Sequence, residues 1–171
     1  MKKIKTKFKD LFVVDTRVFK DKRGWLKEEF KKNFIKKNLV FTLVSSSKKN
    51  VLRGLHMQTK KSQDKFLSVL KGRVLDVAVD LRKNSKTYLK HFRCVLSDKN
   101  STSIYIPPGF AHGFLVLSDY ADFEYKCTDY YDPEDECGIL WSDPNLAISW
   151  PLENPIISNK DAAASKLKDL N

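Results

Sequence analysis

Two histidines beside glycines are the side chains in this sequence best suited to acid–base chemistry. His56 ends the segment Arg53-Gly54-Leu55-His56, and His112 lies between Gly109 and Gly113. Histidine exchanges protons near neutral pH more readily than any other side chain. Arginine and lysine residues close by supply positive charge. This combination predicts acid–base chemistry on an anionic substrate.

The elements that must position these histidines have the patterns of β-strands. Residues 74–81 alternate, with apolar side chains on one face and Asp76 and Asp80 on the other, as in a half-buried strand. A strand near 65–70 precedes it, joined by a tight turn at Lys71-Gly72. Further strands are expected at 10–18, 41–47, 91–97, 102–106, 113–117 and 122–128. This rhythm predicts an all-β sandwich or double-sheet barrel.

Helical patterns are few. Phe30 and Phe34 lie four residues apart, which favours a short amphipathic helix over residues 27–37. Residues 161–170 have a weaker helical pattern. No repeat, linker or low-complexity stretch divides the chain, so we expect one domain spanning residues 1–171.

Composition limits the partners. The net charge of +11 permits nucleic-acid binding, but the lysines are scattered and no nucleic-acid motif accompanies them, so we expect a solvated basic surface. No apolar run is long enough to span a bilayer or to form a signal peptide. The three cysteines show no metal or redox spacing, and we interpret them as reduced thiols of a cytoplasmic protein.

The segment before His112 has the spacing Pro-x-Gly-x-x-His, which is similar to the second motif of cupins, a group of jelly-roll proteins. Metal-binding cupins add a His-x-His pair and a glutamate in the preceding motif. Here that place holds His56-Met57-Gln58, with one histidine, and His91 lies in a different strand. A stable transition-metal site needs three or four ligands, so we expect no metal and no other cofactor.

A more specific resemblance runs from about Asp21 to Asp161. The sequence is similar to the dTDP-4-dehydrorhamnose 3,5-epimerase family, metal-free cupin-like epimerases of sugar nucleotides. The resemblance implies a cupin-like jelly-roll double-sheet barrel with one or two short helices. The matching blocks follow in order: Asp21 to Glu28, Leu52 to His56, Ser62-Gln63-Asp64-Lys65, Gly72 to Arg82, Ile106 to Phe114, Tyr125 to Tyr131, Trp141 to Pro144, Trp150-Pro151 and Ser158-Asn159-Lys160-Asp161.

The resemblance also implies roles for individual residues. His56 would be the general base, oriented by Asp161, while Lys65 would stabilise an enolate and Tyr125 would return a proton from the opposite face. The positions implied to contact the substrate are Arg23, Glu28, Arg53, His112, Glu136 and Lys160, with Tyr131 lining the same pocket.

The chemistry of such a reaction requires these residue types. A hydrogen beside a C4 ketone is acidic only when a nearby cation stabilises the developing oxyanion. A histidine base gains from a carboxylate that fixes its tautomer. Each residue also has an ordinary structural reading: His112 as a turn residue, Lys65 as solvated surface, Tyr125 as a core aromatic and Asp161 as a helix N-cap.

The chain departs from the family at the expected nucleotide end of the pocket. The family usually has Gln and Asn at the positions of Phe41 and Leu43, and an aromatic at the position of Leu26. Either these apolar residues weaken the preference for thymidine and allow a CDP- or GDP-linked sugar, or they only fill the core.

We therefore expect an epimerase acting at C3 and/or C5 of a nucleoside-diphosphate 4-keto-6-deoxy sugar through an enolate, in deoxysugar biosynthesis for surface polysaccharide such as the O-antigen of lipopolysaccharide. The alternatives are a C3-only epimerase on a CDP- or GDP-linked sugar, a 3,4-ketoisomerase, or a non-catalytic cupin-like sugar-binding module. We also expect a homodimer in which about thirty N-terminal residues exchange, with Arg23 and Glu28 completing the neighbour's pocket.

Overall fold

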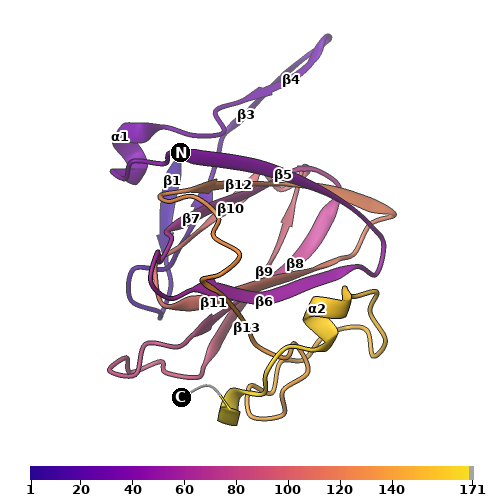
Figure 1. The fold of residues 1–171 in the computed structure, drawn as a ribbon. Coiled ribbons are helices and arrows are strands. Elements are labelled where there is room, and N and C mark those ends of the chain that lie inside the picture. Colours follow the sequence, from indigo (N-terminus) through magenta and orange to yellow (C-terminus); the bar gives the residue numbers. More distant parts are fainter. Residues whose placement is uncertain (170–171) are drawn as a thin grey trace.

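Two antiparallel sheets face each other and form a barrel from which one hairpin projects (Figure 1). The computed structural model describes residues 1–169. The six-stranded sheet has the order β1 (Lys2–Lys5), β2 (Phe12–Asp15), β10 (Thr102–Ile106), β7 (Lys65–Lys71), β12 (Tyr120–Cys127), β5 (Phe41–Lys48). The five-stranded sheet has the order β13 (Glu136–Gly138), β6 (Leu52–Gln58), β11 (Phe110–Val116), β8 (Arg73–Asp80), β9 (His91–Ser97). The all-β double-sheet prediction is confirmed.

The main core lies between the two sheets. Strands β7 and β12 of one sheet contribute Leu67, Val69 and Phe123, and β11 of the other contributes Phe110 and Phe114. Each of these side chains is at most 4% exposed. Burying a side chain of this size contributes on the order of 1.5–3 kcal/mol. The two sheets are therefore held face to face by the apolar side chains that point inward from their strands.

Strand β8 is buried on both faces, which contradicts the prediction of a half-buried strand. Val77 and Val79 pack outward against the C-terminal segment, which includes Ile139 and Leu146. Asp76, on the opposite face, is 0% exposed and points into the barrel. The residue types do alternate between the two faces, as predicted. The face that carries Asp76 points toward the interior of the barrel and not toward water.

The turn at Gly72 joins β7 to β8, as predicted, but these strands do not pair. β7 lies between β10 and β12, whereas β8 lies between β11 and β9. The turn therefore carries the chain from one sheet to the other. This crossing places residues of both strands on the inner surface of one barrel.

The helices are shorter than predicted. α1 spans Lys32–Ile35, within the expected 27–37, because Lys31 provides no side-chain cap and Lys36 adopts the left-handed conformation that ends the helix. The pattern predicted over 161–170 corresponds to α2 (Asn159–Ala162) and the 3-10 helix η1 (Leu167–Asp169), and residue 170 lies outside the described residues. Within residues 1–169, no helix has the length and apolar character needed to cross a membrane.

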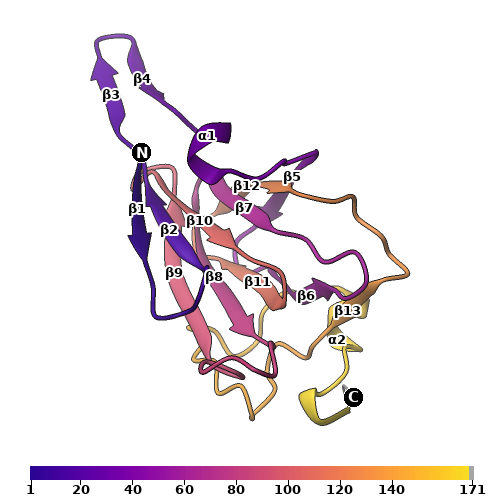
Figure 2. The same ribbon diagram turned by 90° about the vertical axis from the view of Figure 1, so that its left-hand side faces the viewer.

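The N-terminal region contains more strands than the sequence pattern indicated. The expected strand at 10–18 is β2 alone, and β1 pairs with it along the edge of the six-stranded sheet. β3 (Val18–Asp21) and β4 (Gly24–Lys27) form a separate two-stranded hairpin. This hairpin extends away from the barrel in both views (Figures 1 and 2).

Candidate active site

A cavity of about 390 Å³ opens into the barrel and is lined from both sheets and from α2. Strands β5, β7 and β12 form one wall, and β6, β11 and β13 form the other. The predicted site residues that line it are His56, Lys65, Tyr125, Asp161, Phe41, Leu43, Arg53, His112, Tyr131, Glu136 and Lys160. The fold thus gathers residues that are as far as 120 positions apart in the sequence.

Arg23 and Glu28 do not line this cavity. Arg23 lies near the tip of the β3–β4 hairpin, where its side chain is 83% exposed and pairs with Asp21. Glu28 follows the hairpin and pairs with Lys31. Neither residue reaches the cavity of its own chain.

His56 and Asp161 form a close pair at the cavity wall. His56 Nε2 lies 2.5 Å from Asp161 Oδ1, and the Asp161 carboxylate also accepts from the Gly54 amide at 3.5 Å. Burial opposes ionisation of Asp161, but the contact with His56 holds its pKa below the usual value. Asp161 therefore remains a carboxylate. As a hydrogen-bond acceptor it favours the tautomer of His56 with the proton on Nε2, which leaves His56 Nδ1 as the basic nitrogen.

Asp161 is held by the first turn of α2. Ser158 is the N-cap residue, and its Oγ accepts from the Asp161 amide at 3.0 Å. The alternative reading of Asp161 as the N-cap is therefore wrong. The pattern Ser-x-x-Asp at 158–161 resembles a capping box, and that spacing is the signal by which Ser158 was predictable.

Two glycines allow the histidine strands to approach closely. A Cβ on Gly54 would lie 2.6 Å from the Gly113 Cα, and the φ of Gly54 is +119°. In the pairing of β11 with β6, His112 lies opposite His56, and the register shifts just after His112. Any larger residue at Gly54 would push β6 away from β11. The glycine beside each histidine is thus what places both imidazoles in one cavity.

Lys65 and Tyr125 lie on neighbouring strands of the opposite wall. Burial lowers the pKa of Lys65 from its usual value, and the nearby Cys127 and Glu136 oppose that shift only in part. Burial raises the pKa of Tyr125, so this phenol keeps its proton across the physiological range. A partly buried amine and a partly buried hydroxyl donor thus face the His56 wall.

His112 belongs to a second histidine–carboxylate pair, which the sequence reading did not anticipate. His112 Nε2 lies 2.7 Å from Asp76 Oδ2, and the two side chains are 4% and 0% exposed. The His112 ring also meets the edge of Tyr125, with ring centroids 6.2 Å apart. Asp76 thus fixes the orientation of a histidine that lines the cavity.

The mouth of the cavity is charged. Glu136 contacts Lys160, accepts from the Tyr131 hydroxyl at 3.1 Å, and approaches His56 Nδ1 to 3.5 Å. Arg53 also lines the cavity; its side chain is exposed, and its Nε donates to Ser47 Oγ at 3.0 Å. With Lys65, these groups place three cationic side chains around one pocket, as an anionic substrate requires.

The wall formed by β5 is apolar. Phe41 and Leu43 face the cavity, and the Phe41 ring lies 5.8 Å from that of Tyr130. Other lining residues were not proposed from the sequence: Ser45, Gln63, Phe114 and Cys127. Ser45, Phe114 and Cys127 were detectable in principle, because each lies two residues from a predicted site residue along a strand, on the same face.

Among residues 1–169, no group of three or more histidine, cysteine or carboxylate side chains is placed to hold a metal ion. His91 lies outside the cavity and bonds the Leu146 carbonyl at 3.2 Å.

The fold and site together define an acid–base enzyme on a cupin-like barrel, with a pocket for an anionic substrate. The sequence pattern of the dTDP-4-dehydrorhamnose 3,5-epimerase family matches residues 5–169. The chain belongs to this family, and it is an epimerase of the isomerase class.

Individual relatives support the assignment. The dTDP-4-dehydrorhamnose 3,5-epimerase of Escherichia coli is 44% identical, over 99% of this chain and 96% of the relative. That of Neisseria gonorrhoeae is 46% identical over 94% of this chain, which spans 51% of that longer relative. A crystal structure of the Legionella pneumophila enzyme in complex with dTDP-4-keto-L-rhamnose has a TM-score of 0.95 and 44% identity, covering 99% of this chain and 94% of that one.

Proposed function

We propose that this enzyme inverts C3 and C5 of a nucleoside-diphosphate 4-keto-6-deoxy sugar through enolate intermediates. His56 Nδ1 removes the hydrogen beside the C4 ketone, with Asp161 supporting the imidazolium. Lys65 donates to the C4 oxygen as negative charge develops on it, and Tyr125 delivers a proton to the opposite face. The observation that carries the proposal is that the His56–Asp161 pair faces Lys65 and Tyr125 across one cavity.

The remaining residues bind the substrate. Arg53, His112 and Lys160 offer donors to the diphosphate and sugar, and Glu136 with Tyr131 completes the mouth. The names of the relatives favour a dTDP-linked sugar. We place the reaction in the cytoplasm, in synthesis of a deoxysugar for surface polysaccharide; the free thiols of Cys94, Cys127 and Cys137 suit a reducing compartment.

Incubation with a dTDP-4-keto-6-deoxy sugar in D2O tests the reaction. We expect deuterium at C3 and C5 with inversion at both carbons, because each proton is removed and replaced from solvent-exchangeable groups. Deuterium at C3 alone would identify a C3-only epimerase, and movement of the ketone to C3 would identify a 3,4-ketoisomerase. Binding without any exchange would leave a sugar-binding module and contradict the proposal.

We further propose a homodimer in which each hairpin completes the cavity of its partner. The hairpin exposes Phe19, Trp25 and Leu26 by 48%, 56% and 71%, which is apolar surface that a second copy would cover. Arg23 and Glu28 lie on or beside this hairpin, remote from the cavity of their own chain. A neighbour's cavity is where these side chains can act.

Complementation tests this exchange. Arg23→Ala removes the side chain that the hairpin contributes, and His56→Asn removes the general base. Co-expression of these two variants gives mixed dimers that contain one subunit of each. In a mixed dimer, the cavity with intact His56 receives the intact Arg23 of the other subunit, so we expect turnover above that of either parent homodimer. A protein that sediments as a monomer and is fully active would contradict hairpin exchange. So would a mixed dimer whose turnover does not exceed that of either parent homodimer.

The apolar wall leads to a prediction about the nucleotide. Phe41 presents a ring, and Leu43 has no hydrogen-bonding group. Stacking on an aromatic ring is worth about 1–3 kcal/mol for any base, whereas discrimination between bases needs hydrogen bonds. We expect dTDP, CDP, GDP and UDP to bind with affinities within about tenfold of one another. Calorimetry with the four nucleotides measures this, and a dTDP affinity more than about tenfold above the rest refutes it.

A further inference from the structure

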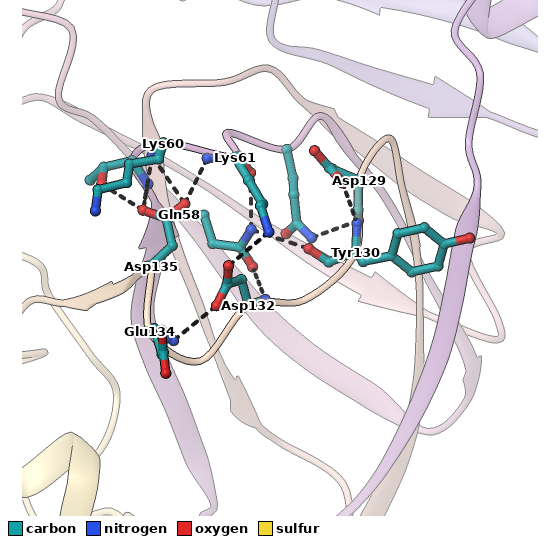
Figure 3. Close-up of polar contacts among 10 residues, drawn as sticks. Gln58, Lys60, Lys61, Asp129, Tyr130, Asp132, Glu134 and Asp135 are labelled. Atoms are coloured by element: carbon teal, nitrogen blue, oxygen red, sulfur yellow. Dashed lines mark hydrogen bonds and ion pairs between the residues drawn. The ribbon is translucent and has the colours of Figure 1, made fainter.

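The segment between β12 and β13 forms the rim of the cavity and carries Tyr131. It is fastened to the turn that follows β6, the strand of His56 (Figure 3). The segment spans residues 129–135, and the turn spans residues 59–63. Although some 70 positions apart in the sequence, they are joined by a dense set of hydrogen bonds.

Asp135 provides the strongest part of this connection. Its Oδ1 accepts from the Thr59 hydroxyl at 2.8 Å and the Lys60 amide at 2.8 Å, and its Oδ2 accepts from the Lys61 amide at 2.6 Å. Asp135 is 8% exposed. These amide donors hold its pKa at about 2, so the carboxylate stays charged at every pH above about 4. A charged acceptor roughly doubles the strength of each bond.

Gln58 provides the second part. Its side-chain Nε2 donates to the carbonyls of Lys61 at 2.9 Å and Tyr130 at 3.2 Å, and its Oε1 accepts from the Asp132 amide at 3.0 Å. Gln58 is 5% exposed and lies two residues after His56 on β6. One buried amide thus links the strand of the base to both the turn and the rim.

A third side chain adds one bond, because Gln63 Nε2 donates to the Asp129 carbonyl at 2.8 Å. Lys61 pairs with Asp132 at 3.0 Å, but the lysine side chain is 58% exposed, and such pairs contribute little. The Tyr130 side chain points away from the polar cluster in Figure 3. Asp135 and Gln58 therefore make more of the hydrogen bonds between the rim and the turn than any other side chain.

The rim matters because of its neighbours in the cavity. Tyr131 lies inside the fastened segment, and Glu136 directly follows Asp135 and pairs with Gln58 across β13 and β6. We propose that Asp135 and Gln58 are positioning residues, which hold Tyr131 and Glu136 at the mouth so that the substrate meets a preformed site. This inference rests on the proposed function, because it takes those two residues as substrate contacts.

Asp135→Ala tests the inference. A rim that is ordered only about a tenth of the time raises the apparent dissociation constant about tenfold. We expect KM for the sugar nucleotide and the calorimetric dissociation constant for dTDP to rise by about that factor, while kcat stays within about twofold. The Thr59, Lys60 and Lys61 amides should exchange with D2O faster than in the wild type.

Asp135→Asn keeps one neutral acceptor and should give a smaller rise in KM than Asp135→Ala. If the alanine variant does not fold, the KM of the asparagine variant tests the inference. Glu134→Gln is the matched control: it removes the same charge from an exposed side chain of the same segment, and it should change neither KM nor exchange. An unchanged KM in both Asp135 variants, or a fall in kcat alone, overturns the inference. Because hydrogen exchange and dTDP binding need no turnover, they remain decisive even if no sugar nucleotide is epimerised.

Discussion

His56→Asn should reduce epimerisation by about 100- to 10,000-fold, the contribution of a positioned general base. Asparagine is close in size to histidine but cannot accept and carry the substrate proton. The cavity would otherwise be retained, because Asp161 stays anchored by Ser158 and by the Gly54 amide. Deuterium incorporation from D2O should fall by the same factor as turnover, since both need the first proton removal.

The third histidine provides a matched control. His91→Asn makes the same change outside the cavity, where His91 bonds the Leu146 carbonyl. We expect it to alter thermal stability slightly and to leave turnover and exchange near those of the wild type. If His56→Asn is folded, binds dTDP and still turns over at a comparable rate, then His56 is not the base.

The barrel could be predicted from the sequence because its strands are specified by patterns within short segments. Alternating residues and turns at short intervals specify strands, and the blocks around His56, Lys65, Tyr125 and Asp161 carry the resemblance to the family. The structure brings those residues into one cavity. Local pattern and family resemblance were sufficient for that part of the site.

Other features depend on tertiary contacts that no local pattern contains. Asp76 was assigned to a solvent face, because an alternating pattern does not reveal that a barrel encloses its polar side. The helix at 27–37 shortened to four residues because no cap supports its start. The fastening of the rim by Asp135 was not predictable either, since its partners are backbone amides about 75 residues earlier.

The second large effect is expected at Tyr125, which is partly buried. Its hydroxyl lies in a wall of the cavity opposite His56, and burial keeps the phenol protonated. Tyr125→Phe removes the proton donor without removing the ring, which packs against Phe123 at a centroid distance of 4.9 Å. We therefore expect a folded enzyme in which inversion falls by about 100-fold or more, the usual contribution of a general acid.

Proton removal and inversion should then separate. His56 can still abstract the hydrogen and return it, or a solvent deuteron, to the same face. In D2O, mass spectrometry should show deuterium entering the substrate with its configuration retained, while the inverted product accumulates slowly. Tyr130→Phe, which removes a hydroxyl from a ring that is 62% exposed and does not line the cavity, should invert normally. Inversion at the wild-type rate in Tyr125→Phe would show that another group protonates the opposite face, and loss of exchange together with inversion would assign Tyr125 to the first step.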